Sequence, residues 1–188
     1  MTEKTYFNNH FIIAMPNLAD PYFFHTVTYL CQHNDKGALG IVINRSANMK
    51  LGDIFKQMKI PVTSETAVDV PVYAGGPVQQ ERGFVLHSTG DTEWEMSLPI
   101  SDSISLTTSR DVIEAIALDK GPEFYLVALG YAGWGEGQLE KEMLANSWLS
   151  TPYNKTIMFD TPAEMRWKSA AKEIGINIKN LTIPAGHA

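Results

Sequence analysis

The sequence has a single cysteine, no excess of basic residues and no long apolar run. Cys31 is alone among 188 residues, which excludes an intramolecular disulfide and a zinc site built on paired cysteines. The apolar run at residues 11–15 is far shorter than the roughly 20 residues of a membrane span. It also lacks the basic flank of a signal peptide. We therefore expect a soluble, cytoplasmic protein without membrane association.

Basic residues are scarce as well. Fifteen lysines and arginines stand against 21 acidic side chains, which gives a net charge of −6. Proteins that bind duplex DNA usually carry a basic patch, because phosphate neutralisation supplies much of their affinity. Here the basic residues are scattered pairs such as Arg166 and Lys168, and no helix-turn-helix pattern is present. The composition argues against direct nucleic-acid binding.

The apolar content, 44%, is enough for a sizeable core, and the length suits one domain. Residues 26–33 alternate in the manner of a strand, and residues 34–37 (NDKG) are typical turn residues. Residues 38–44 then form the returning strand of a predicted β-hairpin. The run at 123–129 is apolar on both faces, which predicts a central strand.

Helical spacing and capping residues predict four helices. They cover residues 51–58, 108–117, 138–146 and 161–174, the last with Thr161 as N-cap and Gly175 as terminator. Edge strands are predicted at 148–151 and 156–159. Hairpins interspersed with helices favour an α/β or α+β layered protein, and the lack of strict strand–helix alternation argues against a Rossmann domain.

The segment 130–143, GYAGWGEGQLEKEM, is predicted to be a glycine-rich loop between that central strand and a helix. This context suits phosphate binding, but neither nucleotide-binding glycine motif is present and Glu136 would repel a phosphate. A tight structural turn and another ligand or catalytic site remain open alternatives. Glu136 and Glu140 share a helix face and could bind a hard cation, although a solvated face is favoured. We predict no metal and no cofactor.

Three further groups have chemical potential. Cys31 and His33 share a strand face and could form a nucleophilic pair, although a buried strand cysteine is the commoner outcome. His87 ends a predicted strand and could act as a general acid or base, or be structural. Asn44 and Arg45 end the hairpin and could clamp an anion, or form a surface salt bridge.

Taken together, several segments resemble the YqgE/AlgH family of bacterial proteins, which has no established biochemical activity. The resemblance is carried by HNDKGALGIVINR (33–45), VYAGGPVQQERGFVLHS (72–88), LGYAGWGEGQLEKEM (129–143), Trp148 and FDTPAEMRW (159–167). It implies one compact domain over residues 1–188, α/β (α+β) in class, with a twisted, barrel-like mixed β core flanked by helices. We expect the tail, residues 180–188, to be partly ordered.

The resemblance also implies that the motif residues of the family gather near a surface pocket. These residues are Asn44, Arg45, Gly75, Gly76, Pro77, His87, Gly130, Gly133, Trp134, Gln138, Leu139 and Glu140. In this hypothesis Trp134 supplies an apolar wall of the pocket.

Three functional hypotheses follow, and we favour binding over catalysis. The first is a regulatory protein that binds a small molecule or a protein partner and acts indirectly on gene expression, in keeping with the transcriptional-regulator label of the family. The second is a hydrolase in which Glu136 or Glu140 and His87 form an acid–base pair. The third is a regulator that binds DNA directly, which the negative charge argues against.

Overall fold

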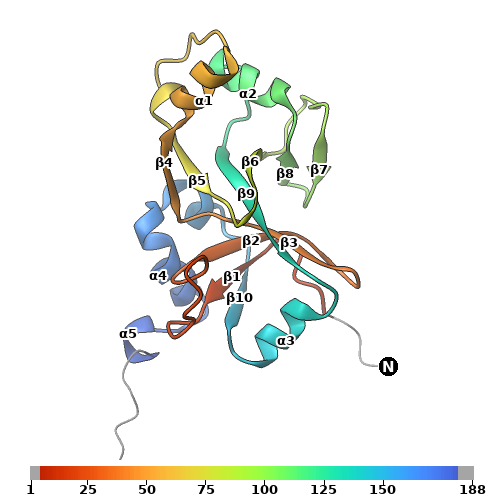
Figure 1. Ribbon diagram of the computed structural model, residues 1–188, viewed down its shortest axis with the longest axis vertical. Helices are drawn as coiled ribbons and strands as arrows, with labels where there is room; N and C mark the ends of the chain where they lie inside the picture. Colours follow the sequence, from red (N-terminus) through yellow and green to blue (C-terminus); the bar gives the residue numbers. More distant parts are fainter. Residues whose placement is uncertain (1–4, 182–188) are drawn as a thin grey trace, which may run out of the picture. The chain divides into compact units, whose positions relative to one another are not determined.

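The computed structural model describes residues 5–181 and divides into two compact units (Figure 1). The first unit contains the chain up to Asn44 and again from Gly133, and the second unit contains residues 45–132. Both combine strands with helices, so the predicted mixed α/β class is confirmed. Most of the predicted tail, residues 182–188, lies outside the described residues. Within the described part, every helix is too short or too polar to cross a bilayer.

The first unit is built on an antiparallel sheet in the order β10–β1–β2–β3. Its strands are β1 (His10–Ala14), β2 (Val27–Asn34), β3 (Gly37–Val42) and β10 (Trp148–Pro152). The predicted hairpin is confirmed, with Asp35 and Lys36 between its strands. Side chains on both faces of β1 and β2 are buried, because helices pack against the sheet.

Four helical segments complete the first unit. They are α3 (Gln138–Leu144), η2 (Thr156–Asp160), α4 (Ala163–Glu173) and α5 (Ile178–Leu181). On α4, Trp167, Ala170 and Ala171 are buried, and the predicted terminator Gly175 follows the end of the helix with a φ of +74°. The N-cap is Pro162 and not the predicted Thr161.

The strand predicted at residues 156–159 is wrong, since this segment is the π-helical turn η2. Local side-chain hydrogen bonds explain the difference. The amide N–H of Ile157 donates to Asn154 Oδ1, and the hydroxyl of Thr161 donates to the carbonyl of Thr156. Such short-range bonds compete with the ladder of a sheet.

The second unit contains a sheet in the order β4–β5–β9–β6–β8–β7. The strands are β4 (Ser46–Lys50), β5 (Pro71–Ala74), β6 (Val78–Ser88), β7 (Ser97–Pro99), β8 (Ile104–Thr107) and β9 (Tyr125–Trp134), whose last two residues belong to the first unit. Only β5 and β9 run parallel. The predicted central strand is confirmed, because β9 lies between β5 and β6.

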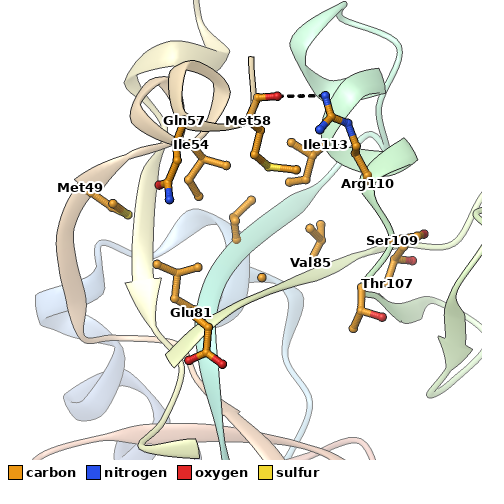
Figure 2. Close-up of a pocket in the computed structure, with 14 residues that line it drawn as sticks. Met49, Ile54, Gln57, Met58, Glu81, Val85, Thr107, Ser109, Arg110 and Ile113 are labelled. Atoms are coloured by element: carbon orange, nitrogen blue, oxygen red, sulfur yellow. Dashed lines mark hydrogen bonds between the residues drawn. The ribbon is translucent and has the colours of Figure 1, made fainter. Parts of the chain in front are cut away.

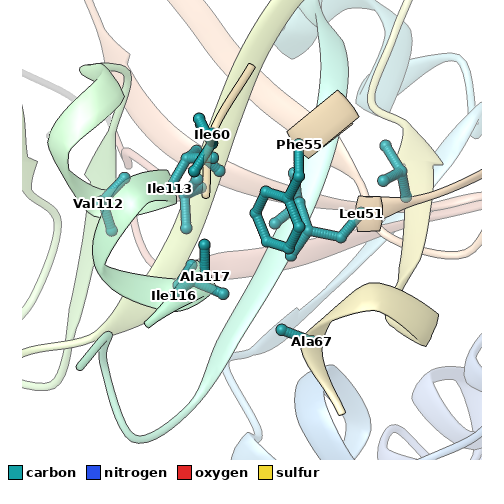
Figure 3. Packing of buried hydrophobic residues seen from close by; sticks show 11 residues of the cluster. Leu51, Phe55, Ile60, Ala67, Val112, Ile113, Ile116 and Ala117 are labelled. Atoms are coloured by element: carbon teal, nitrogen blue, oxygen red, sulfur yellow. The ribbon is translucent and has the colours of Figure 1, made fainter. Parts of the chain in front are cut away.

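Helices α1 (Leu51–Met58) and α2 (Arg110–Ala117), with the short η1 (Ala67–Asp69), pack on this sheet. Their apolar faces form the core of the second unit (Figure 3). This cluster includes Leu51 and Phe55 of α1, Val112 and Ile116 of α2, and Val127 of β9. Burial of these side chains is the main stabilising contribution in the unit, at about 25 cal/mol per Å² of apolar area.

The loop predicted directly after residue 129 is also wrong. Strand β9 continues through Gly130 and Gly133 to Trp134, and the turn before α3 begins only at Gly135. Gly137, with a φ of +67°, is the residue that precedes the helix. Ala132, between the two glycines, and Trp134 are buried and keep the segment in the sheet.

Candidate functional site

Three of the predicted site glycines meet in the second unit, where the β5–β6 connection crosses β9. The amide of Gly75 donates to the carbonyl of Leu129 at 2.7 Å. A Cβ on Gly76 (φ +156°) would lie 2.1 Å from the carbonyl carbon of Tyr131, and one on Gly130 (φ +75°) would lie 2.5 Å from the carbonyl oxygen of Gly76. These glycines therefore allow one backbone segment to contact another.

Trp134 belongs to a packed aromatic cluster in the first unit and is only 6% exposed. Its indole N–H donates to Glu142 Oε2 at 2.9 Å, and the indole of Trp148 donates to the same oxygen at 2.8 Å. The ring of Phe23 packs against both indoles, with centroid distances of 5.9 and 5.3 Å. Both polar and apolar parts of Trp134 therefore have partners within the first unit.

Glu142 is the residue at this position that sequence reasoning missed. Besides the two indoles, its carboxylate accepts from the Gln138 side chain at 2.9 Å. The signal was present, since Gln138 and Glu142 are four residues apart on one helix face and each buried indole needs an acceptor. Glu136, a candidate acid–base residue of the hydrolase hypothesis, is exposed, and Leu139 is fully buried.

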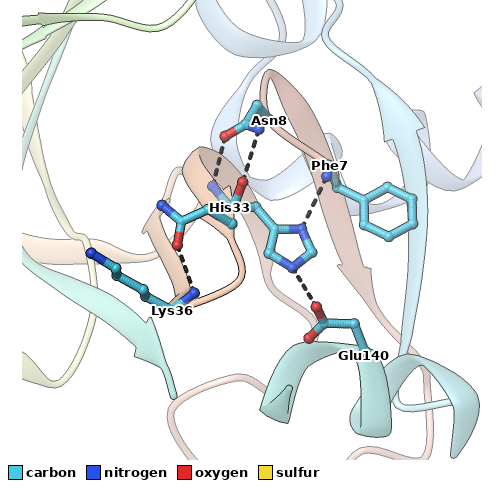
Figure 4. A network of polar contacts seen from close by, with 6 residues as sticks. Phe7, Asn8, His33, Lys36 and Glu140 are labelled. Atoms are coloured by element: carbon cyan, nitrogen blue, oxygen red, sulfur yellow. Dashed lines mark hydrogen bonds and ion pairs between the residues drawn. The ribbon is translucent and has the colours of Figure 1, made fainter. Parts of the chain in front are cut away.

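Glu140 contacts His33 in a second polar cluster of the first unit (Figure 4). His33 Nδ1 accepts the backbone N–H of Phe7 at 3.0 Å, so the ring proton lies on Nε2, which donates to Glu140 Oε1 at 3.1 Å. Asn8 closes the cluster by bonding both the N–H and the C=O of His33. The arrangement joins the N-terminal segment and α3 to the end of β2.

The neighbouring Cys31 does not form a nucleophilic pair with His33. Its side chain is buried and contacts the carbonyl of Tyr29 at 3.7 Å. Burial raises the pKa of the Cys31 thiol far above its usual range, because the thiolate would be desolvated. Cys31 is therefore the buried strand cysteine that the sequence analysis favoured over a nucleophile.

Asn44 and Arg45 lie where the chain passes from the first unit to the second. Within the first unit, Asn44 Oδ1 accepts the N–H of Val27 at 2.8 Å, and its Nδ2 donates to the carbonyl of His25 at 2.9 Å. The Asn44 amide thus bridges the ends of the hairpin. In the second unit, the carbonyl of Arg45 accepts the N–H of Ala74 at 2.7 Å.

His87 is buried in the second unit, with 3% of its surface exposed. Its Nδ1–H donates to the carbonyl of Ser88 at 2.9 Å, which leaves Nε2 as the acceptor of the Thr107 hydroxyl at 2.7 Å. The hydroxyl of Ser97 lies 2.5 Å from that of Thr107. Both ring nitrogens therefore have partners in a structural network, which argues against the acid–base role of the hydrolase hypothesis.

We expect the network at His87 to make the protein less stable in mild acid. Burial lowers the pKa of His87 below its ordinary value of 6.5. Between these two values the unfolded chain binds the proton and the folded chain does not, so stability is full above about pH 6.5 and falls as the pH decreases through the lower folded value. The variant His87→Gln should show a smaller decrease in Tm between pH 7.5 and 5. Equal decreases in the two proteins would contradict this assignment.

The second unit contains a cavity of about 420 Å³, which we call the α1–α2 pocket (Figure 2). Helices α1 and α2 and strands β6, β8 and β9 supply its walls, with Met49 beside them at the end of β4. Ile54, Met58, Val85 and Ile113 form an apolar floor. Gln57, Ser109 and Arg110 are polar residues of the lining. None of the predicted site residues lines this pocket.

Most residues of the α1–α2 pocket lie outside the motif segments, and none was among the predicted site residues, so sequence reasoning missed the site. Their one signal was the marked amphipathic character of residues 51–58 and 110–117. Within residues 5–181, no three histidine, cysteine, aspartate or glutamate side chains converge as metal ligands would. The α1–α2 pocket itself offers apolar contact, hydrogen bonding and the charges of Glu81 and Arg110.

The fold and this pocket define a mixed α/β protein with a cavity of ligand size. A family model described as AlgH-like matches residues 11–179, and the chain belongs to this family. A UPF0301 protein of Methylococcus capsulatus is 50% identical over 99% of this chain and 98% of its own length. A UPF0301 protein of Thioalkalivibrio sulfidiphilus is 49% identical over the whole of both chains.

Two solved structures are similar along almost the whole chain. The solution structure of the AlgH protein from Pseudomonas aeruginosa has a TM-score of 0.80 and 45% identity, covering 100% of this chain and 99% of that one. A crystal structure of a protein from Corynebacterium diphtheriae has a TM-score of 0.74 at 15% identity, covering 98% and 95%. The second likeness concerns the fold alone.

Proposed function

We propose that this protein is a regulatory protein that binds a small ligand, and that the α1–α2 pocket is its binding site. The observation that carries the proposal is the pocket itself. Its volume of about 420 Å³ falls within the usual range for small-molecule sites, and its apolar floor has a few polar groups beside it. Met49 and Met58 supply flexible, polarisable side chains that adapt to different ligand shapes.

An indirect route to gene expression fits the charge of the chain. With a net charge of −6, the protein would repel the phosphates of a duplex at long range. A ligand that binds the folded state stabilises it, and one that binds one conformation more tightly than another shifts the population toward that conformation, a change that a protein partner could sense. The regulatory effect is therefore proposed to pass through a ligand and a partner protein.

A substitution at Gly83 tests the site, because this residue lines the pocket and has room for a side chain. A Cβ at Gly83 would meet no other atom within 4 Å. Gly83 and Val85 lie two residues apart on β6 and so face the same side of the sheet, toward the pocket. The variant Gly83→Leu should therefore fill the pocket without displacing the backbone.

We expect metabolites that bind to raise the Tm of the wild type and not that of Gly83→Leu. A ligand at 100 times its Kd adds about 2.7 kcal/mol to the free energy of unfolding. The matched control is Gly90→Leu, because Gly90 also has no atom within 4 Å of its Cβ position but does not line the pocket. A metabolite panel with no stabiliser, or equal stabilisation of Gly83→Leu, would contradict the proposal.

A further inference from the structure

We infer that the α1–α2 pocket selects ligands with an apolar body and a cationic head group, such as aliphatic amines. The inference rests on the proposed function, since it requires that the pocket bind a ligand. It depends on the charges that line the pocket and on the charge of the second unit as a whole.

The two charged side chains of the lining differ in their contacts. Arg110 Nε donates to Glu114 Oε1 at 2.5 Å, and its Nη2 donates to the carbonyl of Met58 at 3.0 Å. The Arg110 charge is therefore balanced by a neighbouring carboxylate. Glu81 is exposed, and its side chain makes no hydrogen bond or ion pair within residues 5–181.

Figure 2 shows Glu81 and Arg110 at opposite ends of the group of lining residues. The apolar side chains of Ile54, Val85 and Ile113 lie between or beside these ends. An elongated ligand could thus place its apolar body on the floor and its head group at the Glu81 end. An ammonium there would meet an unpaired carboxylate and remain hydrated, as long cationic side chains do at apolar surfaces.

The net charge of the whole second unit is negative, like that of Glu81. Residues 45–132 contain seven lysines and arginines against twelve aspartates and glutamates, a net charge of −5 of the −6 in the whole chain. Clefts surrounded by charge of one sign concentrate ligands of the opposite sign. A carboxylate or phosphate head group would be repelled both by Glu81 and by this net charge. The first unit, by contrast, is close to neutral.

Three probes with the same chain and different head groups test the inference: octylamine, octanol and octanoate. Binding is measured by calorimetry at pH 7 and low ionic strength. We expect octylamine to bind about tenfold more tightly than octanoate, with octanol between them. Glu81→Gln should lower the affinity for octylamine about three- to fivefold and leave the affinity for octanol unchanged, because an exposed charge pair contributes little more than this to binding.

The matched control is Glu93→Gln, which removes one acidic charge from an exposed residue of the same unit that does not line the pocket. It should change the affinity for octylamine less than twofold. Gly83→Leu should abolish binding of all three probes.

Equal or tighter binding of octanoate would overturn the inference, and so would an unchanged preference in Glu81→Gln. If these probes still bind and Gly83→Leu still abolishes their binding, the proposed function stands without the inferred selectivity. No binding by any probe also overturns the inference, and the metabolite panel then decides the proposed function by itself.

Discussion

Alanine at position 76 is expected to lower the free energy of unfolding by about 3 kcal/mol or more, which would place it among the severe single substitutions. Its Cβ would lie 2.1 Å from the carbonyl carbon of Tyr131 and 2.2 Å from the carbonyl oxygen. These are backbone atoms of the central strand β9, so they cannot rotate away as a side chain would. Urea unfolding followed by circular dichroism measures the difference.

Gly90→Ala is the control for this experiment, because a Cβ there meets no atom within 4 Å. It should change stability by no more than about 0.5 kcal/mol. If Gly76→Ala is as stable as Gly90→Ala, the close approach of the β5–β6 connection to β9 does not exist in solution. In that case the structural explanation for Gly75, Gly76 and Gly130 would fail as well.

Replacing Glu142 by glutamine should destabilise the protein by about 2–3 kcal/mol, since hydrogen bonds to a charged acceptor contribute about 1.5–3 kcal/mol. One carboxylate oxygen accepts both indoles, and the other accepts the Gln138 amide. An amide in this place can offer a single oxygen, so at least one donor loses its partner. Chemical denaturation gives the energy, and the indole N–H resonances of Trp134 and Trp148 should both shift.

Glu136→Gln is the matched control, since Glu136 is exposed and lies just before the same helix. It should leave both indole resonances unchanged and alter stability by less than about 0.5 kcal/mol. A Glu142→Gln variant with unshifted indole resonances would show that the carboxylate does not join the two tryptophans.

Elements encoded in short windows could be predicted from the sequence. The hairpin around Asp35 and Lys36 and the bounds of α1 agree with alternation and helical spacing. The strand prediction for residues 156–159 was wrong because a few side-chain hydrogen bonds determined the conformation of this segment despite its β-like composition. The predicted end of the strand β9 was wrong because glycines usually indicate loops, whereas here Gly130 allows a close contact between two backbone segments.

The candidate site, like the fold, could be predicted from the sequence only in part. Motif residues such as Gly76 and Trp134 could be found in the sequence, but their contacts could not. The two indoles that share Glu142 come from β9 and β10, and the α1–α2 pocket has walls from residues 49 to 129. No local pattern records which distant side chains will face a common space. The role of the predicted site residues as a ligand pocket stays a prediction.

What the sequence by itself determined is the chemistry that the protein can draw on. One cysteine excludes an intramolecular disulfide, the acidic composition disfavours nucleic-acid binding, and local periodicity sets most strands and helices. The tertiary structure alone decided which groups are engaged and which face an open cavity. The physical reason is that burial and hydrogen-bond partners arise from long-range packing, which buried His87, Cys31 and Trp134 among partners and left an open cavity lined by Met58 and Arg110.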